Sequence, residues 1–236
     1  MTIETFMMTV KIIMVLNGVI ALLSFLFYKR RATHIKLLGL NFLYQIVAYF
    51  SMAVFDLKGM EVNIPGNIQL FFTFLTLTAI YYIQFQKRYT RFFLVVTILY
   101  LVFAVVNILF IQKMYVNSYT VAFLDFAVMV YCILYFYRLL IELPAQHLQR
   151  VPMFWISTSF LVQSAGDFFL FMFTAYLTKF FFNDVLIYWT IHNLLLMVHG
   201  LLIIVGVSFD LKNAISPSGK GQTSFNVSTS RRRVNE

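Results

Sequence analysis

Four ionisable residues stand in otherwise apolar stretches of this sequence, and they are the residues best suited to binding or chemistry. They are Asp125, Asp167, His192 and His199. A charged side chain at the centre of a membrane helix costs about 2.5–3.5 kcal/mol, so such groups usually face the interior of a helix bundle and pair with one another. An imidazole beside carboxylates can also take up a ligand, a cation or a proton.

The positions of these residues predict a shared polar layer. At a rise of 1.5 Å per residue, Asp125 and His192 lie about 10 Å, and Asp167 about 15 Å, from the same end of their predicted helices. We therefore predict that the three side chains lie at a similar depth on different helices. Asn193 follows His192 in the sequence, and Gln163 lies one helical turn from Asp167 on the same face. Asn17 and Asn107, from the first and fourth predicted helices, are candidates to join the layer, and Gln45 extends the polar residues toward the middle of the membrane.

The spacing of the histidines argues against a metal site. Trp189, His192 and His199 share one helical face, but the two histidines are seven residues apart, about 10.5 Å along the axis. Helical zinc sites use histidines four residues apart, and a single cysteine, Cys132, excludes a cysteine-based zinc site. We predict no metal and no cofactor. Trp189 is expected to cap the polar layer, and His199 to extend it inward.

The apolar stretches around these residues dominate the chain. Of its 236 residues, 61% are hydrophobic and 11% are charged, which is typical of a membrane protein. Seven stretches reach the roughly 20 residues that cross a bilayer: 9–28, 37–55, 67–86, 92–111, 119–141, 153–178 and 185–208. The predicted fold is all-α and polytopic. It comprises a seven-helix transmembrane bundle over 1–208 and a flexible basic cytoplasmic tail over 209–236.

The basic residues predict the orientation of the bundle. Fourteen of the 18 Lys and Arg residues, among them Lys29, Arg88 and Arg138, fall in the loops of one side. The positive-inside rule then places the C-terminus in the cytoplasm and the N-terminus outside. This distribution explains the net charge of +9 without a nucleic-acid partner. It favours a multi-pass protein of a bacterial inner (cytoplasmic) membrane, with the lipid bilayer as its surroundings.

Several classes of membrane protein lack their required residues here. The seventh predicted helix has no lysine for a retinal Schiff base, and His192 and His199 do not have the HxxxH interval of ceramidase-type hydrolases. Ser157, Ser159 and Ser164 are not set in the Gly-x-Ser-x-Gly elbow of a serine hydrolase. We therefore assign no catalytic residue.

Two segments in the last part of the chain resemble a family of small membrane proteins. The segment "YRLLIELPAQHLQRVPMFWISTSFLVQSAGDFFLFMF" (137–173) precedes "IYWTIHNLLLMV" (187–198). The matching features are Glu142-Leu-Pro, Pro152-x-Phe154-Trp155-Ile, Gly166-x-Phe168-Phe169-x-Phe171 and Trp189-x-Ile191-His192-Asn193. They are similar to small seven-helix proteins of Bacteroidota and to stand-alone sensor regions of histidine kinases. The resemblance implies a role associated with signalling.

Together these observations favour a membrane sensor or receptor-like module with an outward-facing polar cavity. We predict a site that binds an unidentified small ligand, ion or proton, formed by Asp125, Asp167, His192, Asn193, Gln163, Trp189 and His199. Because the sequence holds no kinase or cyclase domain, signalling requires a separately encoded histidine kinase or response regulator. A small-solute or ion transporter is an alternative. So is a membrane-embedded lipid-modifying enzyme with Asp167 and His192 as an acid–base pair. The simplest account of the same residues is hydrogen bonding between helices.

Overall fold

The computed structural model describes residues 3–61, 63–112, 118–142, 145–174, 176–177 and 185–215. This part of the chain forms seven α-helices and no strand: α1 (Ile3–Phe25), α2 (Thr33–Leu57), α3 (Asn63–Gln84), α4 (Thr90–Val106), α5 (Ser118–Glu142), α6 (Pro152–Met172) and α8 (Val185–Ile215). Short 3-10 segments precede α2 (η1, Tyr28–Arg30) and α6 (η3, Ala145–Arg150), and α4 continues into a π-helical turn (η2, Asn107–Ile111). The predicted all-α fold is confirmed.

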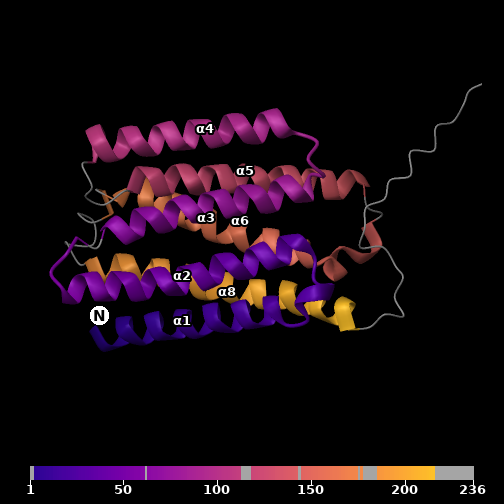
Figure 1. The fold of residues 1–236 in the computed structure, drawn as a ribbon, viewed down its shortest axis with the longest axis horizontal. Helices are drawn as coiled ribbons and strands as arrows, with labels where there is room; N and C mark the ends of the chain where they lie inside the picture. Colours follow the sequence, from indigo (N-terminus) through magenta and orange to yellow (C-terminus); the bar gives the residue numbers. More distant parts are fainter. Residues whose placement is uncertain are drawn as a thin grey trace, which may run out of the picture.

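The helices run alternately in opposite directions and form one bundle (Figure 1). α6 packs between α5 and α8, α1 packs against α8 and α2, and α3 packs against α2. α4 lies at the edge of the bundle, beyond α3 and α5 (Figure 1). We call the end at which α1 begins the N-terminal end of the bundle, and the end at which α8 finishes its C-terminal end.

Six of these helices are long and apolar enough to cross a membrane: α1, α2, α3, α4 with η2, α5 and α8. α6 has a comparable length of 21 residues and contains Ser157, Gln163, Ser164 and Asp167, but it is not one of these six. Six of the seven predicted spans thus meet the criteria of length and composition. The exception is the helix that lies between α5 and α8, in which Ser157, Ser164 and Asp167 are buried.

α8 is longer than the last helix predicted from the sequence. We expected that helix to end at 208 and a flexible tail to begin at 209, whereas α8 continues to Ile215. The first part of the predicted tail is therefore helical. The remainder, residues 216–236, lies outside the described part of the chain.

An ion pair at the C-terminal end holds the extended part of α8. The Nη1 atom of Arg31 donates to Oδ2 of Asp210 at 2.6 Å, and its Nη2 atom donates to the backbone oxygens of Leu23 at 2.6 Å and Val207 at 3.3 Å. Burial lowers the pKa of the Arg31 guanidinium, and the Asp210 carboxylate opposes that shift. One side chain thus joins the α1–α2 connection to α8.

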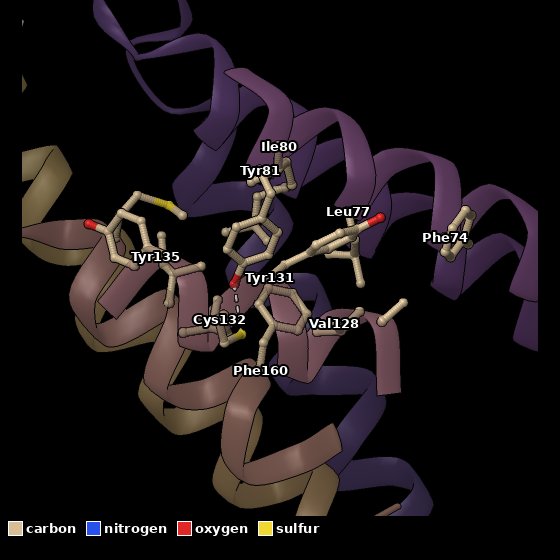
Figure 2. Close-up of a cluster of buried hydrophobic side chains, with 14 of the residues drawn as sticks. Phe74, Leu77, Ile80, Tyr81, Val128, Tyr131, Cys132, Tyr135 and Phe160 are labelled. Carbon is tan, nitrogen blue, oxygen red and sulfur yellow. Dashed lines mark hydrogen bonds between the residues drawn. The ribbon is translucent and has the colours of Figure 1, made fainter. Parts of the chain in front are cut away.

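Aromatic and aliphatic side chains fill the half of the bundle next to the C-terminal end (Figure 2). Tyr81 of α3 is fully buried, and its hydroxyl lies 3.0 Å from the sulfur of Cys132 and donates to Ser157 Oγ at 3.2 Å. Tyr131 and Phe160 pack around it (Figure 2). This half is closely packed, and the polar atoms of Tyr81 are satisfied within it.

Candidate functional site

A small cavity lies at the centre of the bundle and is enclosed by α1, α2, α3, α5, α6 and α8. Its volume is about 50 Å³. The polar residues that line it are Asn17, Gln45, Tyr49, Thr73, Asp125, Gln163, Ser164 and His199. A space of this size holds one or two water molecules or a bare ion, whereas pockets for small organic ligands measure about 300–1,000 Å³.

Buried Asp167 and partly exposed His192 form a pair on the N-terminal side of this cavity. Nδ1 of His192 lies 2.8 Å from Oδ1 of Asp167, with the aspartate side chain 3% exposed and the histidine 17%. Gln163 donates to the other carboxylate oxygen at 3.3 Å. The rings of Phe171 and Trp189 stand edge-on to the imidazole, 5.5 and 5.7 Å from its centroid. The structure thus brings together Asp167, His192, Gln163 and Trp189.

Asp125 enters the cavity from α5. Its side chain is buried and shares a hydrogen bond with Ser164, which lies less than one helical turn from Asp167. The second oxygen, Oδ2, has no hydrogen-bond partner. Among the described residues, no basic side chain forms an ion pair with Asp125. Because an unpaired carboxylate is costly in an apolar interior, its charge needs a proton or a cation for balance.

His199 also lines the cavity and is held by Ser159. The Ser159 hydroxyl donates to the His199 backbone oxygen at 2.7 Å and lies 2.8 Å from Nδ1 of the same residue. The hydroxyl has one proton, so Nδ1 is the donor in the second contact. The imidazole therefore does not accept the serine proton, and the pair is not an activated nucleophile. Phe42 and Phe160 pack on the ring.

Of the three asparagines in the predicted layer, only one lines the cavity. Asn193 donates to Thr9 Oγ1 at 2.9 Å and so joins α8 to α1 without contacting Asp167. Asn107 donates to Thr120 at 2.8 Å, at the start of α5. Asn17 does line the cavity. The predicted site thus divides into a central group and a separate contact between α1 and α8 through Asn193.

Three of the polar residues that line the cavity were not predicted: Tyr49, Thr73 and Ser164. Ser164 carries a usable signal, because it lies three residues before Asp167 and shares its helical face. Tyr49 and Thr73 carry none, because hydroxyl side chains occur throughout these helices and only the rotation of α2 and α3 directs these two inward.

The Asp167–His192 contact has the distance expected of an acid–base pair. An apolar groove of about 500 Å³ runs along the outside of α6 and α8, bordered by residues such as Gly166, Phe169 and Leu195. Neither Asp167 nor His192 lines it. The groove therefore gives a lipid substrate no contact with the pair.

Over its described residues, the chain is an all-helical bundle with six helices long and apolar enough to cross a membrane and a small polar cavity at its centre. Comparison with protein-family models, curated proteins and solved structures yields no match. Within the described residues, no group of three or more His, Cys, Asp or Glu side chains is placed to hold a metal ion.

Proposed function

We propose that this chain is a membrane sensor module that detects a small monovalent cation at Asp125 and signals through a separate partner. The observation that carries the proposal is the buried Oδ2 atom of Asp125, which has no partner and belongs to a residue lining the central cavity. A cation such as Na⁺ would neutralise this carboxylate. The oxygen atoms of Gln45, Thr73 and Ser164 from the same lining are the hard ligands that such ions prefer.

The size of the cavity narrows the class of ligand. At about 50 Å³ it admits a bare ion or water but no sugar, amino acid or nucleotide. A proton is the competitor of the cation, since either neutralises the same carboxylate oxygen. The sensed variable is therefore the concentration of a small cation, modulated by protons.

The packing of the bundle favours sensing over transport. Transport needs a continuous path, whereas the side of the cavity toward the C-terminal end is bordered by Phe160, Leu77 and the aromatic core around Tyr81. His192, on the other side, is partly exposed. These features favour a cavity reached from the N-terminal end only.

The proposal also includes the orientation of the helices in the membrane and the partner that receives the signal. We infer seven spans with α6 included, because its polar residues face α5 and α8, and a bacterial inner-membrane location with the N-terminal end outside. The basic residues at the C-terminal end, such as Lys29 and Arg150, would then face the cytoplasm. A separately encoded histidine kinase or response regulator is the proposed partner. The Arg31–Asp210 contact at this end links α8 to the α1–α2 connection that faces such a partner.

The test uses tryptophan fluorescence as a local reporter. The chain has two tryptophans, so Trp155→Phe leaves Trp189, whose ring lies 5.7 Å from His192. The purified protein in nanodiscs is titrated with NaCl, KCl or choline chloride at constant ionic strength. We expect a saturable change in emission with Na⁺ that Asp125→Asn abolishes. Asp56→Asn is the matched control, because Asp56 is an exposed acid at the end of α2.

Three outcomes contradict the proposal. A response that persists in Asp125→Asn, or the absence of a response to any cation, refutes the cation site. Uptake of radioactive Na⁺ by proteoliposomes, at a rate that Asp125→Asn reduces, shows a transporter and refutes the sensor.

A further inference from the structure

The lining of the central cavity is not built from oxygen atoms alone. The imidazole of His199 and the ring of Phe160 border the same space as the Asp125 carboxylate. Hard metal ions such as Na⁺ and K⁺ prefer oxygen ligands, so an imidazole nitrogen and an aromatic ring add little to the binding of such an ion. These two side chains indicate which cation the cavity is best suited to hold.

His199 turns a hydrogen-bond acceptor toward the cavity. The Ser159 hydroxyl donates to the backbone oxygen of His199, so Nδ1 of the ring, 2.8 Å from that hydroxyl, is a donor. In the neutral ring, Nε2 then carries a lone pair and can only accept. No described residue donates to Nε2, and Nε2 is not one of the fully buried atoms without a partner. It therefore borders open space, and the cavity is the open space that His199 lines.

Asp125 supplies a second acceptor to the same cavity, and this one carries charge. Its Oδ2 atom has no hydrogen-bond partner among the described residues. The hydroxyl oxygens of Tyr49 and Thr73, also in the lining, are further acceptors. The cavity thus offers acceptors from α2, α3, α5 and α8 to a single occupant that has hydrogen-bond donors and a positive charge.

The aromatic wall is compatible with such an occupant. The ring of Phe160 lies 4.8 Å from the imidazole of His199, measured between centroids, and both residues line the cavity. The face of an aromatic ring attracts a cation. The volume of about 50 Å³ admits an ion of the size of a water molecule and no large organic cation.

We infer that the cation bound at this site is ammonium, an inference that rests on the proposed cation site at Asp125. Ammonium has four N–H donors and no acceptor. Two of them donate to Asp125 Oδ2 and His199 Nε2, and the hydroxyl oxygens of Tyr49 and Thr73 are available to the others. K⁺ is of similar size but has no hydrogen to donate, so His199 Nε2 favours ammonium over K⁺.

The experiment compares ammonium with an ion of matched size. The Trp155→Phe protein in nanodiscs is titrated with NH₄Cl, KCl or NaCl at fixed pH and constant ionic strength, and the emission of Trp189 is recorded. We expect ammonium to reach half-saturation at a concentration about tenfold lower than K⁺, the effect of one hydrogen bond to a charged group.

A histidine variant tests the role of Nε2. His199→Asn keeps an amide NH₂ that can donate to Ser159 in place of Nδ1 but has no atom in place of Nε2, and we expect it to lose the preference for ammonium over K⁺. His34→Asn is the matched control, because His34 belongs to α2 and does not line the cavity, and we expect it to keep the preference.

The outcomes separate this inference from the proposed function. Equal half-saturation by ammonium and K⁺ in the Trp155→Phe protein, together with a Na⁺ response that Asp125→Asn abolishes, overturns the ammonium assignment and leaves the cation site. A preference that persists in His199→Asn overturns it as well. If His199→Asn does not fold, the comparison of ammonium with K⁺ in the Trp155→Phe protein still decides. No response to any of the three ions refutes both proposals.

Discussion

The two buried aspartates provide the sharpest test of the site, because replacing each by asparagine is expected to change stability in opposite directions. Asp167 accepts hydrogen bonds from His192 and Gln163. Asp125 has one oxygen without a partner. We therefore expect Asp167→Asn to destabilise the protein, and Asp125→Asn to stabilise it when no cation is bound.

The magnitudes follow from the contacts. In Asp167→Asn, the bond with His192 loses its charge, and the new NH₂ group meets the NH₂ group of Gln163. We expect the free energy of unfolding to fall by about 2 kcal/mol, since charged hydrogen bonds contribute about 1.5–3 and neutral ones about 0.5–1.5 kcal/mol. In Asp125→Asn, the amide keeps the Ser164 contact and removes the unsatisfied charge. We expect the free energy of unfolding to rise by about 1–2 kcal/mol.

The free energy of unfolding is measured in mixed micelles by titration with sodium-free denaturing detergent. Ion pairing of Asp125 with an unrecognised cationic group would make both variants less stable by similar amounts. That result would refute the assignment of Asp125 as the unpaired acid, and with it the reason for placing a cation there.

Three further predictions concern the packing of the helices that surround the site. Arg31→Lys should lower the free energy of unfolding by about 2–3 kcal/mol, because one ammonium cannot reach Asp210 and both backbone oxygens together; the exposed Arg30→Lys should not change it. Gly206→Ala should cost about 1–3 kcal/mol, because its Cβ would lie 2.9 Å from a backbone oxygen of α6. Gly18→Ala, with no atom within 4 Å of its Cβ, should have no cost in the same assay. Cys132 is buried and should react with a maleimide only after denaturation, as mass spectrometry would show.

The type and approximate position of the helices could be predicted because a membrane helix needs one continuous apolar stretch. Their ends could not be predicted equally well, because ends depend on contacts between distant segments. α8 illustrates this: its continuation to Ile215 includes Asp210, whose partner Arg31 lies on the α1–α2 connection. The residues that follow position 208 do not by themselves indicate that Asp210 pairs with Arg31.

For the site, the depth of the polar residues along their helices could be predicted, whereas the direction in which each side chain points could not. Counting residues placed Asp125, Asp167 and His192 at a similar level, and the structure places the latter two in contact and the first beside Ser164. Direction depends on the rotation of each helix about its axis. Asn193 follows His192 by one position, a rotation of about 100°, and this turns it toward Thr9 of α1.

The order of the helices supplies an independent argument that hydrocarbon surrounds this bundle. In water, an edge helix places its polar residues outside. Here the edge helix α4 has a mean hydropathy of 2.9, the highest of the six, and exposes Leu94, Ile98 and Val102 by 51–57%. α6, with Asp167 and Gln163, lies between α5 and α8 instead. Such an arrangement minimises free energy only if contact with the surroundings favours apolar side chains, as lipid does.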